Sequence, residues 1–271
     1  MSRYDTMFAR LRERNEGAFG AFVMLGDPDL ETSAALLDAL VEGGADMLEV
    51  GIPFSDPVAD GPVIQAAAER ALAQGVTPPD CFELLKAFRA RHPHVPVGIL
   101  TYANLVLAPG RDAFYRAAAG AGVDSVLVAD VPAFEAEPFV AAAEAAGVAP
   151  VMIAAQNTPA PTLKRVAELG DGYTYCVARA GVTGAGARVN FDHSALLEEL
   201  DRHGAPPAVF GFGISRPDHV TTALRTGAAG VISGSAIVKL IEDNPSNPAP
   251  AVREFIRSMK AATAHQTSPR T

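Results

Sequence analysis

The sequence predicts a (β/α)8 barrel, or TIM barrel, on three observations. Eight short apolar segments of strand length alternate with helical patterns along the chain. In four places a glycine ends a helix and a short turn enters a buried strand, as in G-A-D-M-L-E-V, G-V-D-S-V-L-V, G-V-A-P-V-M-I and G-A-A-G-V-I-S. Eight such units fit the 271 residues of the chain, because barrels of this class take about 250 residues.

A doubly wound open sheet is the alternative fold. Such a sheet more often carries G-x-G-x-x-G after the first strand, where this chain has the turn Gly26-Asp27-Pro28. We expect one barrel domain over residues 1–265, with an extra N-terminal helix and a short extra helix after the eighth strand. A frayed polar tail is expected over 266–271.

The strands are placed by apolar runs and the turns that bound them. The first is expected at 18–25, and the second begins at Met47 and breaks at Gly51 and Pro53. The other expected strands are 97–101, 125–129, 149–154, 173–177, 208–211 and 229–233. The first expected helix, 1–16, has one apolar face, formed by Tyr4, Met7, Phe8 and Leu11. Further helices are expected at 32–42, 63–74, 79–91, 111–121, 134–146, 161–169, 193–203, 217–226, 236–241 and 250–264.

The composition argues against some classes of binding partner and indicates the cellular compartment. The formal net charge of −9 argues against nucleic acid or an anionic membrane surface as the main partner. Cys81 and Cys176 have neither disulfide nor metal-ligand spacing, which fits a reducing cytosol. The N-terminus does not resemble a signal peptide, and no apolar run is long enough to span a bilayer. We therefore expect a soluble, cytoplasmic protein.

A carboxylate lies inside the apolar second strand. Glu49 has apolar residues on both sides, and an ionised carboxylate in such surroundings is unfavourable unless it is paired or protonated. Its pKa is expected to rise, so that it can both give and take a proton near neutral pH. The following loop brings a second acid, Asp60, to the same end of the strand. The alternative is a glutamate on a short edge strand that faces water.

Glycine-rich segments follow the last three strands. Two of them, G-F-G-I-S (211–215) and S-G-S-A (233–236), lie where barrels commonly bind phosphate through backbone amides and a helix N-terminus. Ordinary turn glycines are the alternative. The third, R-A-G-V-T-G-A-G-A-R (179–188), is expected to be a lid that closes over substrate, with a disordered loop as the alternative.

Other chemistries lack candidate residues. The lysines all fall within expected helices, so no Schiff-base nucleophile stands at a strand end: Lys86, Lys164, Lys239 and Lys260. The six histidines lie in helices and outer loops and form no cluster for a catalytic metal. Neither cysteine has a triad partner in view. Acid–base catalysis by carboxylates on a phosphorylated substrate is what remains.

The chain contains, in order, the motifs L-E-V-G-I-P-F-S-D-P-V-A-D-G-P, Y-A-N-L-V, V-L-V-A-D-V-P, G-Y-T-Y-x-x-x-R-A-G-V-T-G, G-F-G-I-S and G-S-A-I-V-K. Together they resemble the alpha subunit family of tryptophan synthase, over about residues 4–262. The resemblance implies a (β/α)8 barrel that cleaves indole-3-glycerol phosphate to indole and glyceraldehyde 3-phosphate. It implies no cofactor in this chain. It also implies a beta-subunit partner, in an alpha2–beta2 heterotetramer, whose pyridoxal phosphate converts the channelled indole and L-serine to L-tryptophan.

Residue by residue, the resemblance implies that Glu49 is the acid–base group, that Asp60 accepts from the indole N–H, and that Tyr175 is a further active-site residue. The implied phosphate site comprises Gly184, Phe212, Gly213, Gly234 and Ser235. The implied indole pocket comprises Phe22, Leu100, Leu127 and Ile153. The implied lid carries Arg179 and Thr183, which closes toward Asp60. The implied partner surface comprises Pro53, Asp56, Tyr102 and Asn104.

Two departures from the family pattern leave the core of this assignment untouched. Residues 154–157 are A-A-Q-N where a proline pair is common, so this loop is expected to meet a partner differently. Ala178 stands where a serine is common before Arg179. Two alternative functions stay open, a free-standing lyase that releases indole and a barrel retained only as a binding or activating subunit. Indole-glycerol-phosphate synthase, a related barrel, is disfavoured because its ring closure relies on lysines at strand ends.

Overall fold

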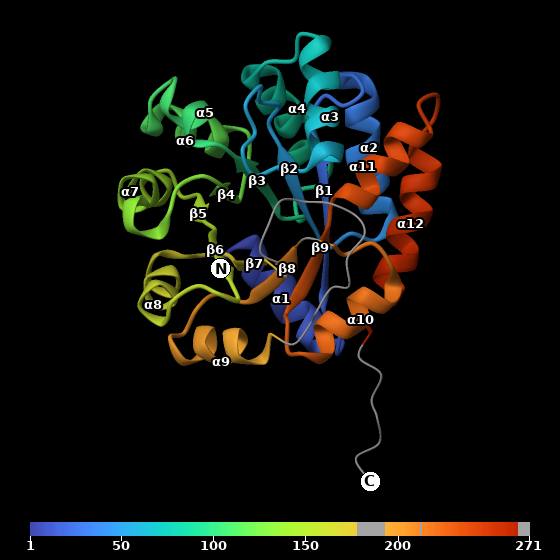
Figure 1. Ribbon diagram of the computed structural model, residues 1–271. Coiled ribbons are helices and arrows are strands. Elements are labelled where there is room, and N and C mark those ends of the chain that lie inside the picture. Colours follow the sequence, from blue (N-terminus) through green and yellow to red (C-terminus); the bar gives the residue numbers. More distant parts are fainter. Residues whose placement is uncertain (178–192, 212, 265–271) are drawn as a thin grey trace.

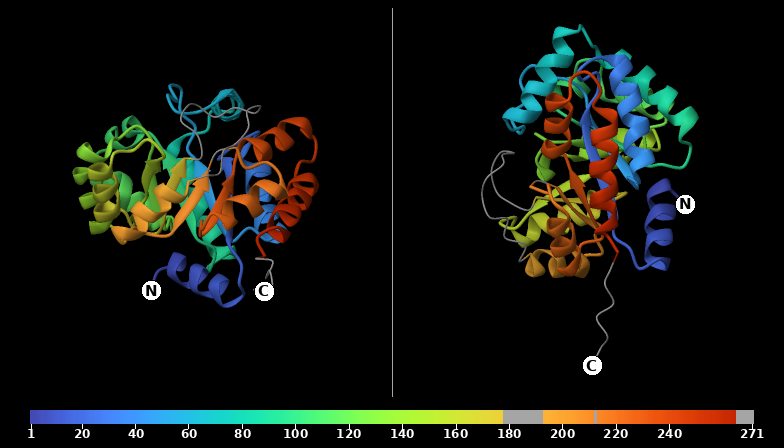
Figure 2. Two further views of the ribbon diagram at one scale, coloured as in Figure 1. Left: turned by 60° about the horizontal axis from the view of Figure 1, so that its bottom comes forward. Right: turned by 90° about the vertical axis from the view of Figure 1, so that its right-hand side faces the viewer.

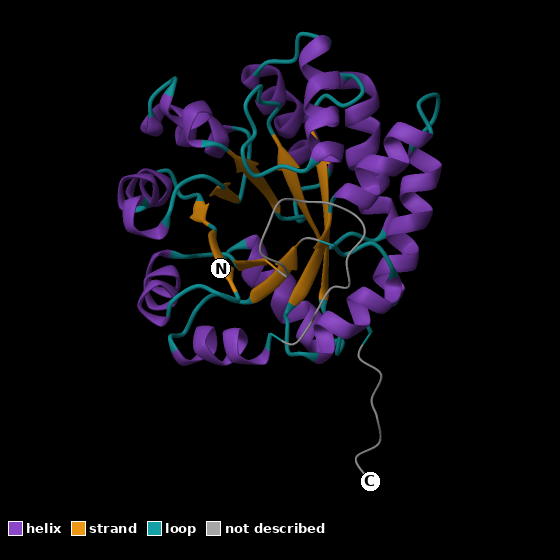
Figure 3. Cartoon of the chain, in the orientation of Figure 1, coloured by secondary structure: helices purple, strands orange, loops and turns teal. Residues whose placement is uncertain are grey.

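The computed structural model describes residues 1–177, 193–211 and 213–264. The strands are β1 (Ala18–Met24), β2 (Met47–Gly51), β3 (Val97–Thr101), β4 (Ser125–Val128), β5 (Ala149–Pro150), β6 (Met152–Ala155), β7 (Thr174–Val177), β8 (Ala208–Gly211) and β9 (Gly230–Ser233). They form one parallel sheet in the order β5-β4-β3-β2-β1-β9-β8-β7-β6, surrounded by helices (Figures 1 and 3). The expected barrel is thereby confirmed, and the tail expected over 266–271 lies outside the described residues.

The two ends of the sheet meet at one interrupted strand. β5 pairs with β4, and β6 pairs with β7. Between them, the amide of Val151 donates to the carbonyl of Val126 at 3.0 Å. An unbroken strand over 149–154 is expected from the sequence, but Pro150 has no amide hydrogen to offer a neighbouring strand. The fifth strand is therefore split, and its two pieces close the barrel.

The helices agree with the sequence within a few residues, with two exceptions. Their bounds are α1 (Arg3–Glu13), α2 (Leu30–Gly43), α3 (Pro62–Ala73), α4 (Pro78–Arg91), α5 (Ala103–Leu107), α6 (Arg111–Gly120), the 3-10 helix η1 (Ala133–Glu135), α7 (Glu137–Ala145), α8 (Ala160–Leu169), α9 (Ser194–Arg202), α10 (Pro217–Arg225), α11 (Ser235–Asp243) and α12 (Ala249–Ala261). The short helix α5 stands where a loop is expected. The helix expected over 134–146 is divided into η1 and α7, because Pro138 fits the first turn of a helix but not its interior.

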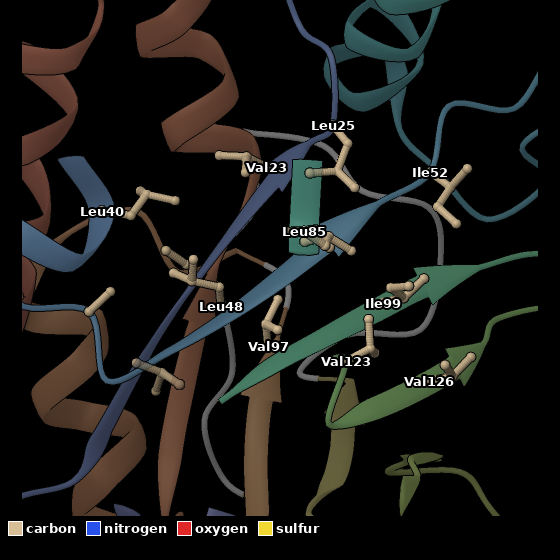
Figure 4. Packing of buried hydrophobic residues seen from close by; sticks show 14 of the residues in the cluster. Val23, Leu25, Leu40, Leu48, Ile52, Leu85, Val97, Ile99, Val123 and Val126 are labelled. Atoms are coloured by element: carbon tan, nitrogen blue, oxygen red, sulfur yellow. The ribbon is translucent and has the colours of Figure 1, made fainter. Parts of the chain in front are cut away.

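Alternation along the strands separates two apolar clusters. Outward-facing side chains pack against the helices, and Figure 4 shows part of this outer cluster: Val23, Leu25, Leu40, Leu48, Ile52, Leu85, Val97, Ile99, Val123 and Val126. Inward-facing side chains form the barrel interior, which includes Phe22, Met47, Leu127, Tyr175 and Ile232. A residue such as Glu49, two positions after Met47, therefore faces the interior and not the helices.

The N-terminal helix α1 lies across one end of the barrel (Figure 2). Its apolar face is buried as the sequence predicts, and it joins the interior cluster: Tyr4, Met7, Phe8 and Leu11. Asp124 anchors the helix, because its carboxylate accepts from Arg3 at 2.8 Å, from Arg89 at 2.6 Å and from the amide of Val97 at 2.8 Å. Within the described part of the chain, no helix is long and apolar enough to cross a bilayer.

We expect Asp124→Ala to destabilise the fold by about 3 kcal/mol, because the largely buried guanidinium of Arg89 would lose its charged partner and the amide of Val97 its acceptor. The free energy of unfolding in urea measures this change. Asp218→Ala is the matched control, because Asp218 and its partner Arg216 are both exposed. This control is expected to leave the urea midpoint unchanged, and equal effects of the two substitutions would contradict the prediction.

Candidate active site

Glu49 lies in the middle of the barrel interior. It is the third residue of β2, stands in register with Phe22 on β1 and Gly98 on β3, and is 1% exposed. The hydroxyl of Tyr173 donates to Glu49 Oε1 at 2.8 Å. A buried carboxylate with one such donor is held in place without being solvated.

Burial raises the pKa of Glu49 to about 7, since the hydrogen bond from Tyr173 lowers it less than burial raises it. The negative charge of Asp60 adds to the rise. This is the direction that the sequence predicts. Near neutral pH the group is therefore poised between its protonated and ionised forms.

Tyr173 is the interior residue to which sequence reasoning gave no role in the site. It precedes β7 and is two positions before Tyr175, so both tyrosines face the interior. The ring of Tyr173 also packs on Tyr4 of α1, with centroids 5.4 Å apart. The pair of tyrosines spaced by two is the signal that could have identified Tyr173.

Asp60 lies at the N-terminal end of α3, where Gln65 Nε2 donates to its carbonyl at 2.6 Å. Its carboxyl is largely buried, and burial raises its pKa. Among the residues that the structure describes, the Tyr102 hydroxyl has no hydrogen-bond partner, so it lies near Asp60 without bonding to it. The carboxylate thus keeps its capacity to accept from a ligand.

The residues expected to form the indole pocket all belong to the interior cluster: Phe22, Leu100, Leu127 and Ile153. Tyr175 completes it, standing in register with Ile153. A Cβ atom added at Gly211 would lie 1.9 Å from the Tyr175 hydroxyl oxygen, so only glycine leaves room for this ring. The structure therefore brings together a cluster of apolar and aromatic side chains beside two carboxyl groups.

The turns after β8 and β9 lie side by side. Ser233 donates from its hydroxyl to the carbonyl of Ile214 at 2.6 Å and so joins them. Gly213 has a φ of 77°, and Gly234 precedes the first turn of α11, which begins at Ser235. A Cβ at Gly234 would lie 3.4 Å from the Phe22 side chain, so this turn borders the interior cluster. A helix N-terminus placed there can hold an anion beside that cluster.

Several expected site residues lie outside the described residues. These are Arg179 and Thr183 of the expected lid, with Gly184 and Phe212 of the expected phosphate site. Ala178 is also among them.

The expected partner surface divides into exposed and buried residues. Asp56 and Asn104 are exposed, whereas Pro53 and Tyr102 are buried and support the loops from within. The same face carries three exposed apolar side chains that sequence reasoning missed, on the loop after β2 and in the short helices α5 and η1 after β3 and β4: Val58, Leu107 and Phe134. Phe134 is 72% exposed, which is unusual for so large an apolar side chain.

No group of three or more metal-ligating side chains occurs in the part of the chain that the structure describes. The lysines lie in α4, α8, α11 and α12, as the sequence predicts, and not at strand ends. The site offers a carboxyl group whose pKa is about 7, a second buried carboxyl group, a cluster of apolar side chains and a backbone turn suited to an anion.

A family model described as "Tryptophan synthase alpha chain" matches residues 8–267. The tryptophan synthase alpha chain of Aeromonas hydrophila is 56% identical over 266 residues, which cover 97% of this chain and 99% of that relative. A Mycobacterium tuberculosis tryptophan synthase structure is similar with a TM-score of 0.88 and 30% identity, covering 98% of this chain and 99% of the other. A tryptophan synthase a2b2 complex of Pyrococcus furiosus is similar with a TM-score of 0.83 and 35% identity, covering 90% of this chain and 98% of the other. This chain therefore belongs to the tryptophan synthase alpha chain family.

Proposed function

We propose that the protein cleaves indole-3-glycerol phosphate to indole and glyceraldehyde 3-phosphate, with Glu49 as the acid–base group. The observation that carries this proposal is the buried Glu49, whose pKa of about 7 leaves both of its forms available at neutral pH. Enzymes use a carboxyl group tuned in this way to give and take a proton within one cycle. The family supports the assignment, and the reaction needs no cofactor in this chain.

Two proton transfers account for the cleavage. Protonated Glu49 gives its proton to indole C3, and positive charge develops on the ring nitrogen, whose N–H donates to ionised Asp60. Glu49, now a carboxylate, takes the proton of the glycerol hydroxyl next to the breaking bond. The oxygen electrons form the aldehyde carbonyl, while the electrons of the C–C bond return to the ring and restore indole. Glu49 ends protonated, as it began.

The turns after β8 and β9 would hold the phosphate group of the substrate. Backbone amides at Gly213 and at the start of α11 supply partial positive charge, which the anionic protein does not offer as a whole. Phe22 lies beside both Gly234 and the Glu49 register position, so it would pack against the substrate between its two ends. A ligand fixed at its phosphate end is thereby presented to the carboxyl groups.

The exposed apolar side chains favour a complex over a free-standing lyase. Val58, Leu107 and Phe134 lie on the face where the strands end, and such side chains at a protein surface are typical of an interface. We infer a beta-subunit partner there, with pyridoxal phosphate in the partner and indole passing between the subunits. The Pyrococcus furiosus relative is described as an a2b2 complex, which supports this inference. A cytoplasmic location is part of the same proposal.

Glu49→Gln is expected to lower the rate of indole release by about 10²-fold to 10⁴-fold, because the amide cannot exchange a proton. The side chain keeps its shape and can still accept from Tyr173, so affinity for an uncleavable indole–alkyl phosphate should stay close to that of the parent. Single-turnover indole release and ligand titration measure the two quantities. Glu168→Gln, an exposed glutamate on α8, is the control and should change neither. Near-parent turnover in the Glu49 variant would reject this role.

The raised pKa of Glu49 predicts a specific pH dependence of stability. Between pH 4.5 and about 7 the folded state keeps a proton that the unfolded state has lost, so unfolding releases a proton and stability falls as pH rises. A shift of this size corresponds to about 3 kcal/mol. The Glu49→Gln variant has no carboxyl group to titrate at this position. As the pH rises from 4.5 to 8, its free energy of unfolding should therefore increase by about that amount relative to that of the parent.

Urea unfolding of both proteins at several pH values tests this linkage. A stability difference that stays constant with pH would contradict it. Glu83→Gln, at an exposed position of α4, is the control. Its free energy of unfolding should differ from that of the parent by the same amount at every pH.

Phe134→Asp and Leu107→Asp are expected to weaken binding of a beta subunit by about tenfold or more each, because a charge would replace an apolar contact at the interface core. Calorimetric titration of the two chains gives the dissociation constants. Leu72→Asp places the same charge on a partly exposed leucine near the C-terminal end of α3 and should leave binding unchanged. Unaltered affinity in both loop variants would remove this surface from the complex.

A further inference from the structure

Asp27, Arg70 and Glu242 form an ion cluster that joins three elements. The Arg70 guanidinium on α3 donates from Nε to Asp27 Oδ1 at 2.7 Å and from Nη2 to Asp27 Oδ2 at 2.9 Å. Its Nη1 lies 3.4 Å from Glu242 Oε1 on α11. Asp27 belongs to the turn after β1, and its side chain is 1% exposed. One guanidinium therefore connects the end of β1 with two helices that are neighbours in Figure 1.

Each connected element carries a part of the candidate active site. Asp60 lies just before α3, and Ser235 of the candidate phosphate turn begins α11. β1 carries Phe22, which borders that turn. Both helices are short and rigid, so a tie near their far ends also constrains their N-terminal ends. The cluster is thus placed to fix the distance between Asp60 and the phosphate turn.

The apolar packing of α3 does not by itself fix the distance between Asp60 and the phosphate turn. The buried face of the helix consists of Ile64 and three alanines, Ala67, Ala68 and Ala71, which give few side chains that could lock a neighbouring helix in one position. A guanidinium that grips a carboxylate through two parallel hydrogen bonds fixes both distance and orientation, whereas an ammonium group acts as a point charge. Burial raises the pKa of Asp27 although Arg70 opposes the rise, so the carboxylate depends on this partner.

We propose that Arg70 is a positioning residue that sets the separation between the indole end of the site, at Asp60, and the phosphate end, at Gly234 and Ser235. The inference rests on the proposed function. It predicts a pattern of ligand affinities that a general role in stability does not predict. A ligand that spans both ends must sense the separation, and a ligand that occupies one end must not.

The test compares three ligands on Arg70→Lys, which keeps a positive charge beside Asp27 but loses the two-pronged contact. The ligands are an uncleavable indole-3-alkyl phosphate, indole alone and glycerol 3-phosphate alone. The spanning ligand is expected to bind about tenfold more weakly or worse, and each fragment within about twofold of the parent. The kcat/KM for indole-3-glycerol phosphate should fall together with the affinity of the spanning ligand.

Two further variants complete the design. Glu242→Gln leaves the buried pair intact and removes the negative charge that faces Arg70 from α11, together with the exposed ion pair of Glu242 with Lys239. It should therefore weaken the spanning ligand selectively but by a smaller factor. Arg253→Lys is the matched control, because Arg253 pairs with Glu42 at 2.5 Å between α12 and α2. It should leave all three affinities unchanged.

Equal losses for all three ligands, or unchanged binding of the spanning ligand to Arg70→Lys, would overturn the positioning role. Should Arg70→Lys fail to fold, Glu242→Gln decides between the same two patterns. A parent chain that neither binds the spanning ligand nor cleaves indole-3-glycerol phosphate would instead overturn the proposed function, so the two failures are told apart by the parent alone.

Discussion

The hydrogen bond from Tyr173 to Glu49 is the interaction on which the barrel interior depends. A carboxylate enclosed by apolar strands destabilises the fold when it is ionised and carries no useful chemistry when it is permanently protonated. One neutral donor offsets part of the effect of burial and leaves the pKa near 7. A second donor or a nearby cation would lower that pKa further and take the acid form away at neutral pH. Among the described residues, the scarcity of polar partners around Glu49 is thus as important to its pKa as the partner that it has.

The same interior is built by strict alternation along the strands. Residues that face outward form the large cluster beneath the helices, so the inward positions can carry tyrosines, a glutamate and glycines without loss of the outer core. Space in the interior is the second constraint. Gly211 admits the Tyr175 ring and Gly51 admits the side chains of Met24 and Phe22, because a Cβ at either glycine would overlap its neighbours. Large aromatic residues and glycines are therefore complementary parts of one packing arrangement.

Sequence reasoning recovered the parts of this arrangement that are written in local patterns. Apolar runs located the strands, and the one acid inside such a run proved to be the buried Glu49. Features that depend on pairing across strands were missed. The Tyr173 contact joins residues 124 positions apart, and the split of the fifth strand depends on which neighbours each half meets. The helix α5 was missed because five residues are too few to show a helical period.

The charge of the protein and the chemistry of the site are consistent with each other. A net charge of −9 repels an anionic ligand at long range, so the site must attract it locally. A lysine would be the simple solution, but none of the buried residues in the described ranges is lysine or arginine. Lys239, on the helix α11 that starts after β9, is instead paired with Glu242 and Asp243. Backbone amides can hold a phosphate group through partial charges and leave the pKa of Glu49 high, whereas a full positive charge in the interior would pull it down. A bound phosphate dianion would act in the same direction as burial and favour the protonated form of Glu49, from which the proposed mechanism starts.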